Sequence, residues 1–193
     1  MTERSYHHGD LRAALLARAV DEVDARGAEG LSLRGLARDL GVSHGASARH
    51  FRDRAALLDA VAIEGFERLL RAMQEASEAD PITTAARAYI AFAIAHPGLL
   101  AASFAAKRAE DPSHALREAG QGVLDFVVAL LARGQEAGIV RDGDPEELAR
   151  IAFAMVHGIA MLAVDGMLYG VAPGQATDEV IAFLAEGLGA ARA

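Results

Sequence analysis

The stretch from Leu31 to Phe51 reads LSLRGLARDLGVSHGASARHF, and it decides the fold of the N-terminal part of the chain. Ser32 and Ser43 each stand directly before a short run of helix-forming residues, which is where N-cap residues are found. Gly41 separates the two runs, and glycine readily adopts the left-handed backbone that ends a helix. The stretch therefore predicts two short helices joined by a tight turn, which is a helix-turn-helix pattern.

The second of these helices, after Ser43, carries mostly short and polar side chains. A helix with such a narrow outer face can enter the major groove of DNA. Two of its side chains, His44 and Arg49, are long enough to reach base edges or phosphates. Spacing alone also fits a helical hairpin inside an ordinary bundle, so the pattern by itself leaves DNA binding and plain packing both open.

Charge is distributed unevenly around this motif. The 193 residues include 19 Lys+Arg and 27 Asp+Glu, a formal net charge of −8. Residues 30–54 nevertheless contain five arginines and two acids, a local charge of +3. Residues 71–193 contain 9 basic and 16 acidic residues, a net charge of −7. The local positive charge favours an anionic partner for the motif, although the chain as a whole is acidic.

The composition predicts an all-α protein. Alanine, the best helix former, occurs 44 times, and aromatic residues make up only 5% of the chain. We expect about nine helices, because capping residues, prolines and glycines divide the apolar periodicity into that many segments. The expected boundaries are Asp10 and Gly27 for the first helix, Asp53 and about Ser77 for the fourth, starts or breaks at Pro81, Pro97, Pro112 and Pro145, and a start at Thr177-Asp178-Glu179 for the last.

Two long stretches lack charge, and neither predicts a membrane span of about 20 apolar residues. Ala88–Ala106 is broken by His96-Pro97-Gly98, and Ile151–Val164 is too short. The N-terminus lacks the basic and apolar regions of a secretory signal. We therefore expect a cytoplasmic protein without a membrane partner. The preference for arginine over lysine, together with the many alanines and glycines, indicates a GC-rich bacterial genome.

A longer segment, GLSLRGLARDLGVSHGASARHFRDRAALLDAVAIEGF, resembles the N-terminal domain of TetR-type (tetracycline-repressor-type) transcriptional regulators. The preceding YHHGDLRAALLARAVDEVDARGAEGLS extends the resemblance to about residues 6–70. The resemblance implies DNA binding and assigns a role to each matching position. Ser32 and Arg34 would start the first motif helix at the DNA backbone, Ser43, His44, Gly45, Ser47 and Arg49 would face the groove, and His50 and Arg54 would contact phosphates.

One position departs from the family pattern. The family usually has a tyrosine where this chain has Ala48, and the tyrosine hydroxyl commonly contacts a phosphate. We hypothesise that the neighbouring Arg49 replaces this contact.

The resemblance also implies a regulator in two parts. Residues 1–54 would form the DNA-binding domain with its motif at 32–51, residues 55–80 a linking helix, and residues 81–193 a domain that binds a ligand and dimerises. The last two predicted helices are apolar on more than one face, so each needs a partner beyond its own core. We expect a homodimer in which these two helices of each subunit form a four-helix bundle. The dimer would place its two DNA-binding domains on a palindromic operator.

The segment IAFAMVHGIAMLAVDG resembles a subgroup of the same family whose effector domain carries a Trp-His-Gly signature. Here the signature reads Val156-His157-Gly158, so the histidine and the glycine match and the tryptophan does not. Gly158 is expected to permit the close approach of another helix. His157 has two interpretations, a core histidine with one satisfied hydrogen bond or a ligand contact.

The expected effector is a small apolar or amphipathic molecule, because the middle helices are apolar and the chain has few aromatic residues. The apolar and aromatic side chains of these helices include Tyr89 and Phe153; most of the set is expected in the core, and a few would line the pocket. His157 and Asp165 would supply polar contacts to the ligand. The predicted pocket residues are Phe92, Phe104, Phe126, Met155, His157, Met161 and Asp165.

Other functions lack the residues that they need. The motifs H-E-x-x-H, C-x-x-C and G-x-S-x-G and a Gly-rich phosphate loop are absent, and Asp142-Gly143-Asp144 lacks the later ligands of a calcium loop. We therefore expect no catalytic residue, no metal and no cofactor. The resemblance to TetR-type regulators implies a dimeric repressor that a small molecule releases from its operator. Two alternatives stay open, an all-helical small-molecule-binding protein with weakened DNA binding and a transcriptional activator of the same family.

Overall fold

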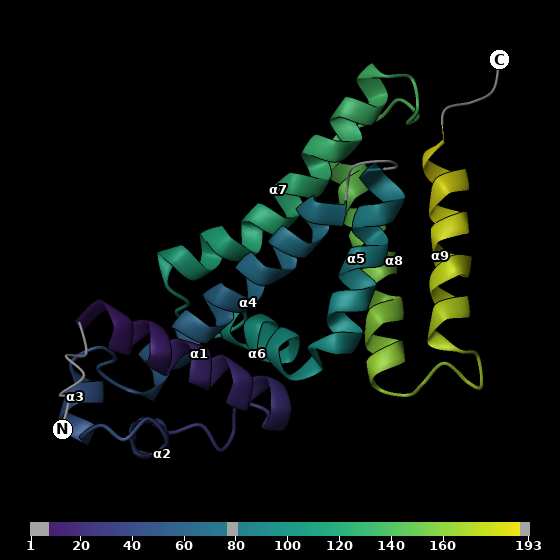
Figure 1. Cartoon of the computed structure of the whole chain (residues 1–193). Helices are drawn as coiled ribbons and strands as arrows, with labels where there is room; N and C mark the ends of the chain where they lie inside the picture. The colour runs from purple at the N-terminus through teal and green to yellow at the C-terminus, as the bar shows by residue number, and fades with distance from the viewer. Residues whose placement is uncertain (1–7, 77–80, 190–193) are drawn as a thin grey trace. The chain divides into compact units, whose positions relative to one another are not determined.

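The computed structural model describes residues 8–76 and 81–189. Within these two ranges every regular element is an α-helix, which confirms the all-α prediction (Figure 1). Nine helices lie in the described part of the chain, as many as predicted. They are α1 (His8–Arg26), α2 (Leu33–Asp39), α3 (His44–Ala48), α4 (Arg54–Ala76), α5 (Pro81–Ala95), α6 (Pro97–Lys107), α7 (His114–Glu136), α8 (Pro145–Val164) and α9 (Pro173–Leu188).

The helices form two compact units. The first unit contains the described residues up to Phe66 together with Gly98–Arg117, and the second contains Glu67–Pro97 and the described residues from Glu118 onward. Helices α4 and α7 contribute residues to both units. This division groups α6 with the N-terminal helices, whereas the predicted functional boundaries at residues 54 and 80 followed the chain order.

In the first unit, α1 packs against α2 and α3. Leu36 and Phe51 are buried, because their apolar side chains face the small core of this unit. Arg18 of α1 forms an ion pair with Asp39 at the end of α2, with 2.8 Å between Nη2 and Oδ2. The guanidinium of Arg12 lies 5.2 Å from the centre of the Phe51 ring. Side chains of α1 therefore hold both helices of the motif.

Local capping produces the turn of the helix-turn-helix, as the sequence predicts. The Ser32 hydroxyl accepts the backbone N–H of Gly35 at 3.1 Å, and the Ser43 hydroxyl accepts that of Ala46 at 3.2 Å. Gly41 has a φ of +68°, the left-handed backbone that a side chain would strain. Each predicted cap in this motif is therefore confirmed.

Other predicted helix boundaries hold at some ends and shift at others. The Asp53 carboxylate accepts the Ala56 N–H at 2.7 Å and begins α4, as predicted. The predicted end of this helix near Ser77 lies outside the described residues, and α4 extends at least to Ala76. The first helix begins at His8, so Asp10 lies inside α1 and the prediction of Asp10 as its cap is wrong.

The starts of α7 and α9 lie close to prolines, one before the helix and one at its first position. Helix α9 begins at Pro173, four residues before the predicted start at Thr177, because the fixed φ of proline suits the first helical position. The Thr177 hydroxyl donates to the Pro173 carbonyl at 2.8 Å instead of capping a helix. Helix α7 begins just after Pro112, with the hydroxyl of Ser113 accepting the Leu116 N–H at 3.0 Å.

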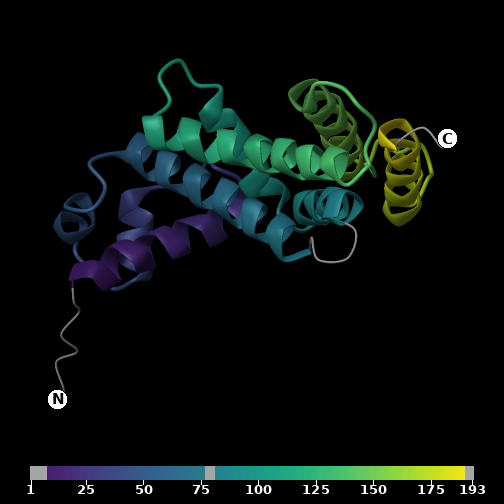
Figure 2. The ribbon, with the colours of Figure 1, turned by 90° about the horizontal axis from the view of Figure 1, so that it is seen from above.

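In the second unit, α5, α8 and α9 lie side by side (Figures 1 and 2). Small residues allow this packing, because Ala93 of α5 and Ala149 and Ala160 of α8 are fully buried between the helices. Leu184 of α9 is also buried. These three helices thus share part of the core of the second unit, while Ile151 and Phe183 remain exposed.

Helix α8 has 20 residues and is, in the described part of the chain, the one unbroken helix that is long and apolar enough to span a membrane by length and composition. The predicted uncharged stretch was shorter because it began at Ile151, whereas the helix begins at Pro145. Only 28% of the apolar window is buried within the single chain. Much of this apolar helix is thus available to contact another molecule.

Candidate nucleic-acid interface and ligand region

Helix α3 presents a small, exposed surface. His44, Gly45, Ala48 and Arg49 are all exposed, and so is the capping residue Ser43. A Cβ atom at Gly45 would meet no heavy atom within 4 Å. The outer face of α3 therefore carries no large side chain at Gly45. The imidazole of His44 and the guanidinium of Arg49 are exposed at the two ends of the same short helix.

Ser47 does not belong to this face. Its side chain is fully buried, and its hydroxyl donates to the His44 carbonyl at 2.9 Å. The prediction that Ser47 faces the groove is therefore wrong. The reason is the helical period, since Ser47 lies on the inner side of α3, where it packs against the other helices of the first unit.

Three of the five arginines in residues 30–54 have side chains that are free to contact another molecule. Arg34, Arg38 and Arg49 are exposed, and their side chains make no hydrogen bond or ion pair with any described residue; these three are called the uncommitted arginines. Arg52 instead pairs with the adjacent Asp53 at 3.1 Å. Uncommitted guanidinium groups are suited to phosphates and to the acceptor edge of guanine.

Arg54 has a different role from the predicted phosphate contact. Its Nε donates to the Leu31 carbonyl at 3.0 Å, and its Nη2 donates to the carbonyls of Ala28 and Glu29. These carbonyls belong to the loop between α1 and α2. Arg54 thus ties the start of α4 to the start of the helix-turn-helix, and its donors are largely engaged within the protein.

His50 and Ser32 complete the predicted set. Ser32 is exposed at the start of α2, where its hydroxyl acts as a helix cap. His50 is half-buried just after α3. Both lie in the same unit as the exposed face of α3, so the first unit contains every predicted DNA-contacting residue.

The predicted ligand-pocket residues are divided between the two compact units, with Phe104 in the first and the other six in the second. Phe104 lies in the first unit, where its ring packs edge-on against Phe66 with 5.2 Å between ring centres. Asp165 is exposed at the C-terminal end of α8. Phe92 is buried beside His96. Of the seven residues Phe92 alone is buried, Asp165 is exposed, and the other five are half-buried. A ligand pocket formed by these residues therefore stays a prediction.

Within the second unit, His157 belongs to an aromatic cluster. Its Nδ1 lies 2.8 Å from the hydroxyl of Tyr89, and its ring stacks on Phe153 with 5.3 Å between centres. Tyr89 is 2% exposed, and burial raises the pKa of its hydroxyl well above the ordinary value, so the hydroxyl stays protonated at neutral pH. A protonated hydroxyl donates to a neutral imidazole, which is the contact that the core interpretation of His157 requires.

We predict that removing this hydroxyl destabilises the protein. Tyr89→Phe should lower the free energy of unfolding by about 1–2 kcal/mol, because His157 loses a buried hydrogen-bond donor. Tyr169→Phe is the matched control, since Tyr169 is 93% exposed and should cause no change. Urea unfolding followed by circular dichroism measures both.

The same contact predicts a pH effect with a defined sign. The folded-state pKa of Tyr89 is raised, so its contribution to stability is complete below the ordinary tyrosine pKa of about 10 and is lost as the pH rises above it. Wild-type stability should therefore fall more steeply above this pH than that of Tyr89→Phe. Equal slopes for the two proteins would contradict the assignment.

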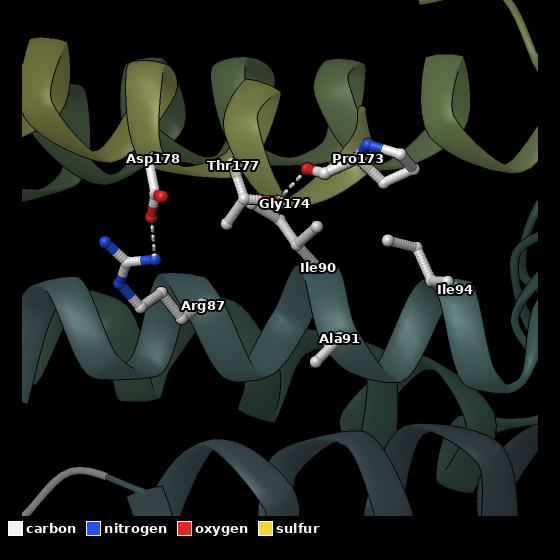
Figure 3. A pocket seen from close by; sticks show the side chains of 8 residues that line it. All are labelled: Arg87, Ile90, Ala91, Ile94, Pro173, Gly174, Thr177 and Asp178. Carbon is white, nitrogen blue, oxygen red and sulfur yellow. Dashed lines mark hydrogen bonds and ion pairs between the residues drawn. The ribbon is translucent and has the colours of Figure 1, made fainter. Parts of the chain in front are cut away.

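A shallow groove of about 330 Å³ lies between α5 and α9 (Figure 3). Arg87 and Asp178 form an ion pair at one end, while Ile90 and Ile94 extend along α5. Sequence reasoning missed this groove because its residues come from helices far apart in the chain. Its complete lining is Arg87, Ile90, Ala91, Ile94, Pro173, Gly174, Thr177 and Asp178.

Comparison with known protein families agrees with this geometry. Residues 15–61 match the family described as bacterial regulatory proteins, tetR family, and residues 82–188 match the tetracyclin repressor-like C-terminal domain. The second match alone spans more than half of the 193 residues. The chain belongs to the TetR family. The TetR assignment confirms the resemblance read from the sequence and supports a DNA-binding regulator.

Solved structures resemble this TetR chain over nearly its whole length. A protein of unknown function from Rhodococcus sp. RHA1 is 42% identical, with a TM-score of 0.89 over 97% of this chain and 100% of that one. A bacterial regulatory protein of the TetR family from Rhodococcus RHA1 is 19% identical, with a TM-score of 0.72 over 94% and 98% of the two chains, and shows the fold alone. No curated protein matches. The Trp-His-Gly subgroup is not shown by these comparisons and stays a prediction.

Proposed function

We propose that this TetR-family chain is a repressor that binds a palindromic operator as a homodimer and leaves it when a small molecule binds. The observation that carries the proposal is the exposed face of α3 beside uncommitted arginines. Short side chains let this helix enter a major groove, and His44 and Arg49 reach beyond them. Arg34 and Arg38 on α2 supply further positive charge for the DNA backbone.

Dimerisation is supported by the exposed face of α8. Ile151 and Leu162 are 48% and 38% exposed, although both are large apolar residues. Between them Ala154 and Gly158 are also exposed, and a Cβ at Gly158 would meet no heavy atom within 4 Å. Gly158 therefore does not serve the predicted close approach within one described chain, but it suits the approach of a helix from a second copy.

Helix α9 extends the apolar face available for a dimer. Phe183 is 66% exposed on α9, which packs beside α8. Two helices from each subunit would form an isologous four-helix bundle. Two recognition helices about 34 Å apart would then read two successive major grooves on one side of the DNA.

Ligand response would act through α4. This helix runs without interruption from Arg54 to Ala76 and contributes residues to both compact units. A ligand that favours one position of α4 would change the separation of the two α3 helices and lower operator affinity. The ligand would be apolar or amphipathic, and the regulator would act in the cytoplasm.

Fluorescence anisotropy tests DNA binding directly. The full-length protein is titrated into labelled duplex DNA from upstream of its own gene, with random duplex as competitor and at several salt concentrations. Binding that survives competitor and weakens linearly in log salt supports the proposal. Binding that random duplex abolishes contradicts specific regulation by this DNA and favours the alternative of a small-molecule-binding protein with weakened DNA binding.

A panel of small apolar and amphipathic compounds then tests the response. Compounds that raise the melting temperature are added to the protein–operator complex. Release of the operator supports a ligand-relieved repressor. A compound that binds the protein but leaves operator affinity unchanged contradicts the coupling through α4.

A further inference from the structure

Helix α6 begins in backbone contact with the end of α1. Gly98, the second residue of α6, lies so close that a Cβ atom there would be 2.4 Å from the Val23 carbonyl oxygen and 2.6 Å from that of Asp24. Both obstacles are backbone atoms, so neither can move aside as a flexible side chain can. Only glycine fits this contact without displacing one helix from the other.

A side chain of α1 also caps α6. The backbone N–H of Leu99 donates to Oδ1 of Asp24 at 3.3 Å. This N–H belongs to the first turn of α6, where a helix has no backbone acceptor of its own. The Asp24 carboxylate thus supplies a hydrogen bond and a negative charge at the positive end of α6.

The opposite side of α6 packs on α4. A Cβ at Gly65 would be 2.2 Å from the Ser103 hydroxyl, which shows how closely the two helices approach. Leu99 and Ser103 are fully buried, and the Ser103 hydroxyl donates to the Leu99 carbonyl at 2.9 Å. Helix α6 is therefore held between α1 and α4 by one glycine contact on each side.

The C-terminal end of the segment formed by residues 98–117 is also held by a hydrogen bond to an acidic residue. The hydroxyl of Ser113 donates to the carboxylate of Asp59 in α4 at 2.8 Å and also caps α7. Residues 98–117 are thus tied at their start to Asp24 and at their end to Asp59. Both acidic residues lie in the N-terminal part of the chain, and all of these contacts lie within the first unit.

Displacing α1 would also displace α3, the proposed recognition helix. Arg18 of α1 pairs with Asp39 of α2, and Arg12 lies over Phe51, which follows α3 directly. Helix α1 therefore holds the motif on one side and contacts α6 at its C-terminal end. The contact at Asp24 and Gly98 connects α6 to the elements that orient α3.

We propose that Asp24 and Gly98 are positioning residues for DNA binding, and that residues 98–117 act as part of the DNA-binding unit although they follow it by more than 30 residues in the chain. The proposal rests on the proposed DNA-binding function. It adds that operator affinity depends on a segment outside the helix-turn-helix that touches no DNA.

Hydrogen exchange on the full-length protein tests the positioning role without DNA. Gly98→Ala and Asp24→Ala should speed the exchange of backbone amides in α1 and α2 by about tenfold, while the amides of α8 keep wild-type rates. Asp24→Asn retains an acceptor oxygen and should restore much of the protection. Gly122→Ala, where a Cβ meets only a side chain at 3.9 Å, and Asp21→Ala, an exposed residue of α1, are the matched controls.

Operator binding supplies the second measurement. On duplex DNA from upstream of the chain's own gene, Gly98→Ala and Asp24→Ala should weaken binding by about tenfold without changing the salt slope, because no phosphate contact is removed. Wild-type rates of exchange in both variants would overturn the proposal. Equally faster exchange in α1 and α8 would also overturn it, because that result indicates general destabilisation.

The two arms separate failure of this proposal from failure of the proposed function. If wild-type protein does not bind the duplex, DNA binding fails as the function, yet the exchange rates still decide whether residues 98–117 hold α1 in place. If Gly98→Ala does not fold, Asp24→Ala and Asp24→Asn carry the same comparison.

Discussion

If α8 forms the proposed dimer interface, a chain carrying Ile151→Glu should sediment as a monomer at concentrations where the wild-type chain sediments as a dimer. Ile151 is 48% exposed on the apolar face of α8, and a two-fold interface would bury the new carboxylate twice. Two buried, unpaired charges should weaken the dimer by about 100-fold or more. Operator affinity should fall when the dimer dissociates, because the DNA-binding domain of a monomer contacts only one half-site.

Ile139→Glu is the matched control for this experiment. Ile139 is 66% exposed, carries the same side chain and lies in the turn after α7 rather than on α8. It should remain dimeric in sedimentation equilibrium and bind DNA as the wild type does. A dimer of unchanged stability in Ile151→Glu would place the interface elsewhere and contradict the α8 bundle.

The second large effect is expected at Arg49. Arg49→Ala should weaken operator binding by about tenfold and reduce the slope of log affinity against log salt by about one, if Arg49 replaces the phosphate contact of the family tyrosine. Arg49→Lys should keep the slope, because it keeps the charge. Arg133→Ala, an exposed arginine of α7 in the second unit, should change neither quantity.

A double variant tests why Arg49 matters. Adding Ala48→Tyr to Arg49→Ala supplies the hydroxyl that this chain lacks, so affinity should recover while the salt slope stays low. An unchanged slope in Arg49→Ala alone would refute the replacement hypothesis.

The helix-turn-helix was predictable from sequence because its determinants are local. Ser32, Gly41 and Ser43 act within four residues along the chain, through one side-chain hydrogen bond or one backbone angle. The burial of Ser47 was not predictable in this way. A small hydroxyl residue is compatible with either face of a helix, and only packing against neighbouring helices decides which face it takes.

The contacts of Arg54 and of α6 were missed for a related reason. Arg54 bonds to carbonyls 23 to 26 residues away, and Gly98 contacts the end of α1 some 75 residues upstream. Backbone carbonyls carry no sequence signal, so an arginine aimed at them resembles one aimed at phosphates. The sequence around Gly98 predicts only a helix break. That no side chain fits at this position follows from how closely α6 approaches the end of α1, which the local sequence does not specify.

Helix α3 has only five residues, far fewer than the roughly 12 that an isolated helix needs to persist in water. Its shape is therefore set by the Ser43 cap, the buried Ser47 and the helices behind it. The exposed positions at 44, 45, 48 and 49 contribute little to holding it in place. Helix-compatible substitutions at those four exposed positions should therefore leave the fold in place, so changing the surface of α3 and keeping the DNA-binding domain folded are largely separate requirements on the sequence.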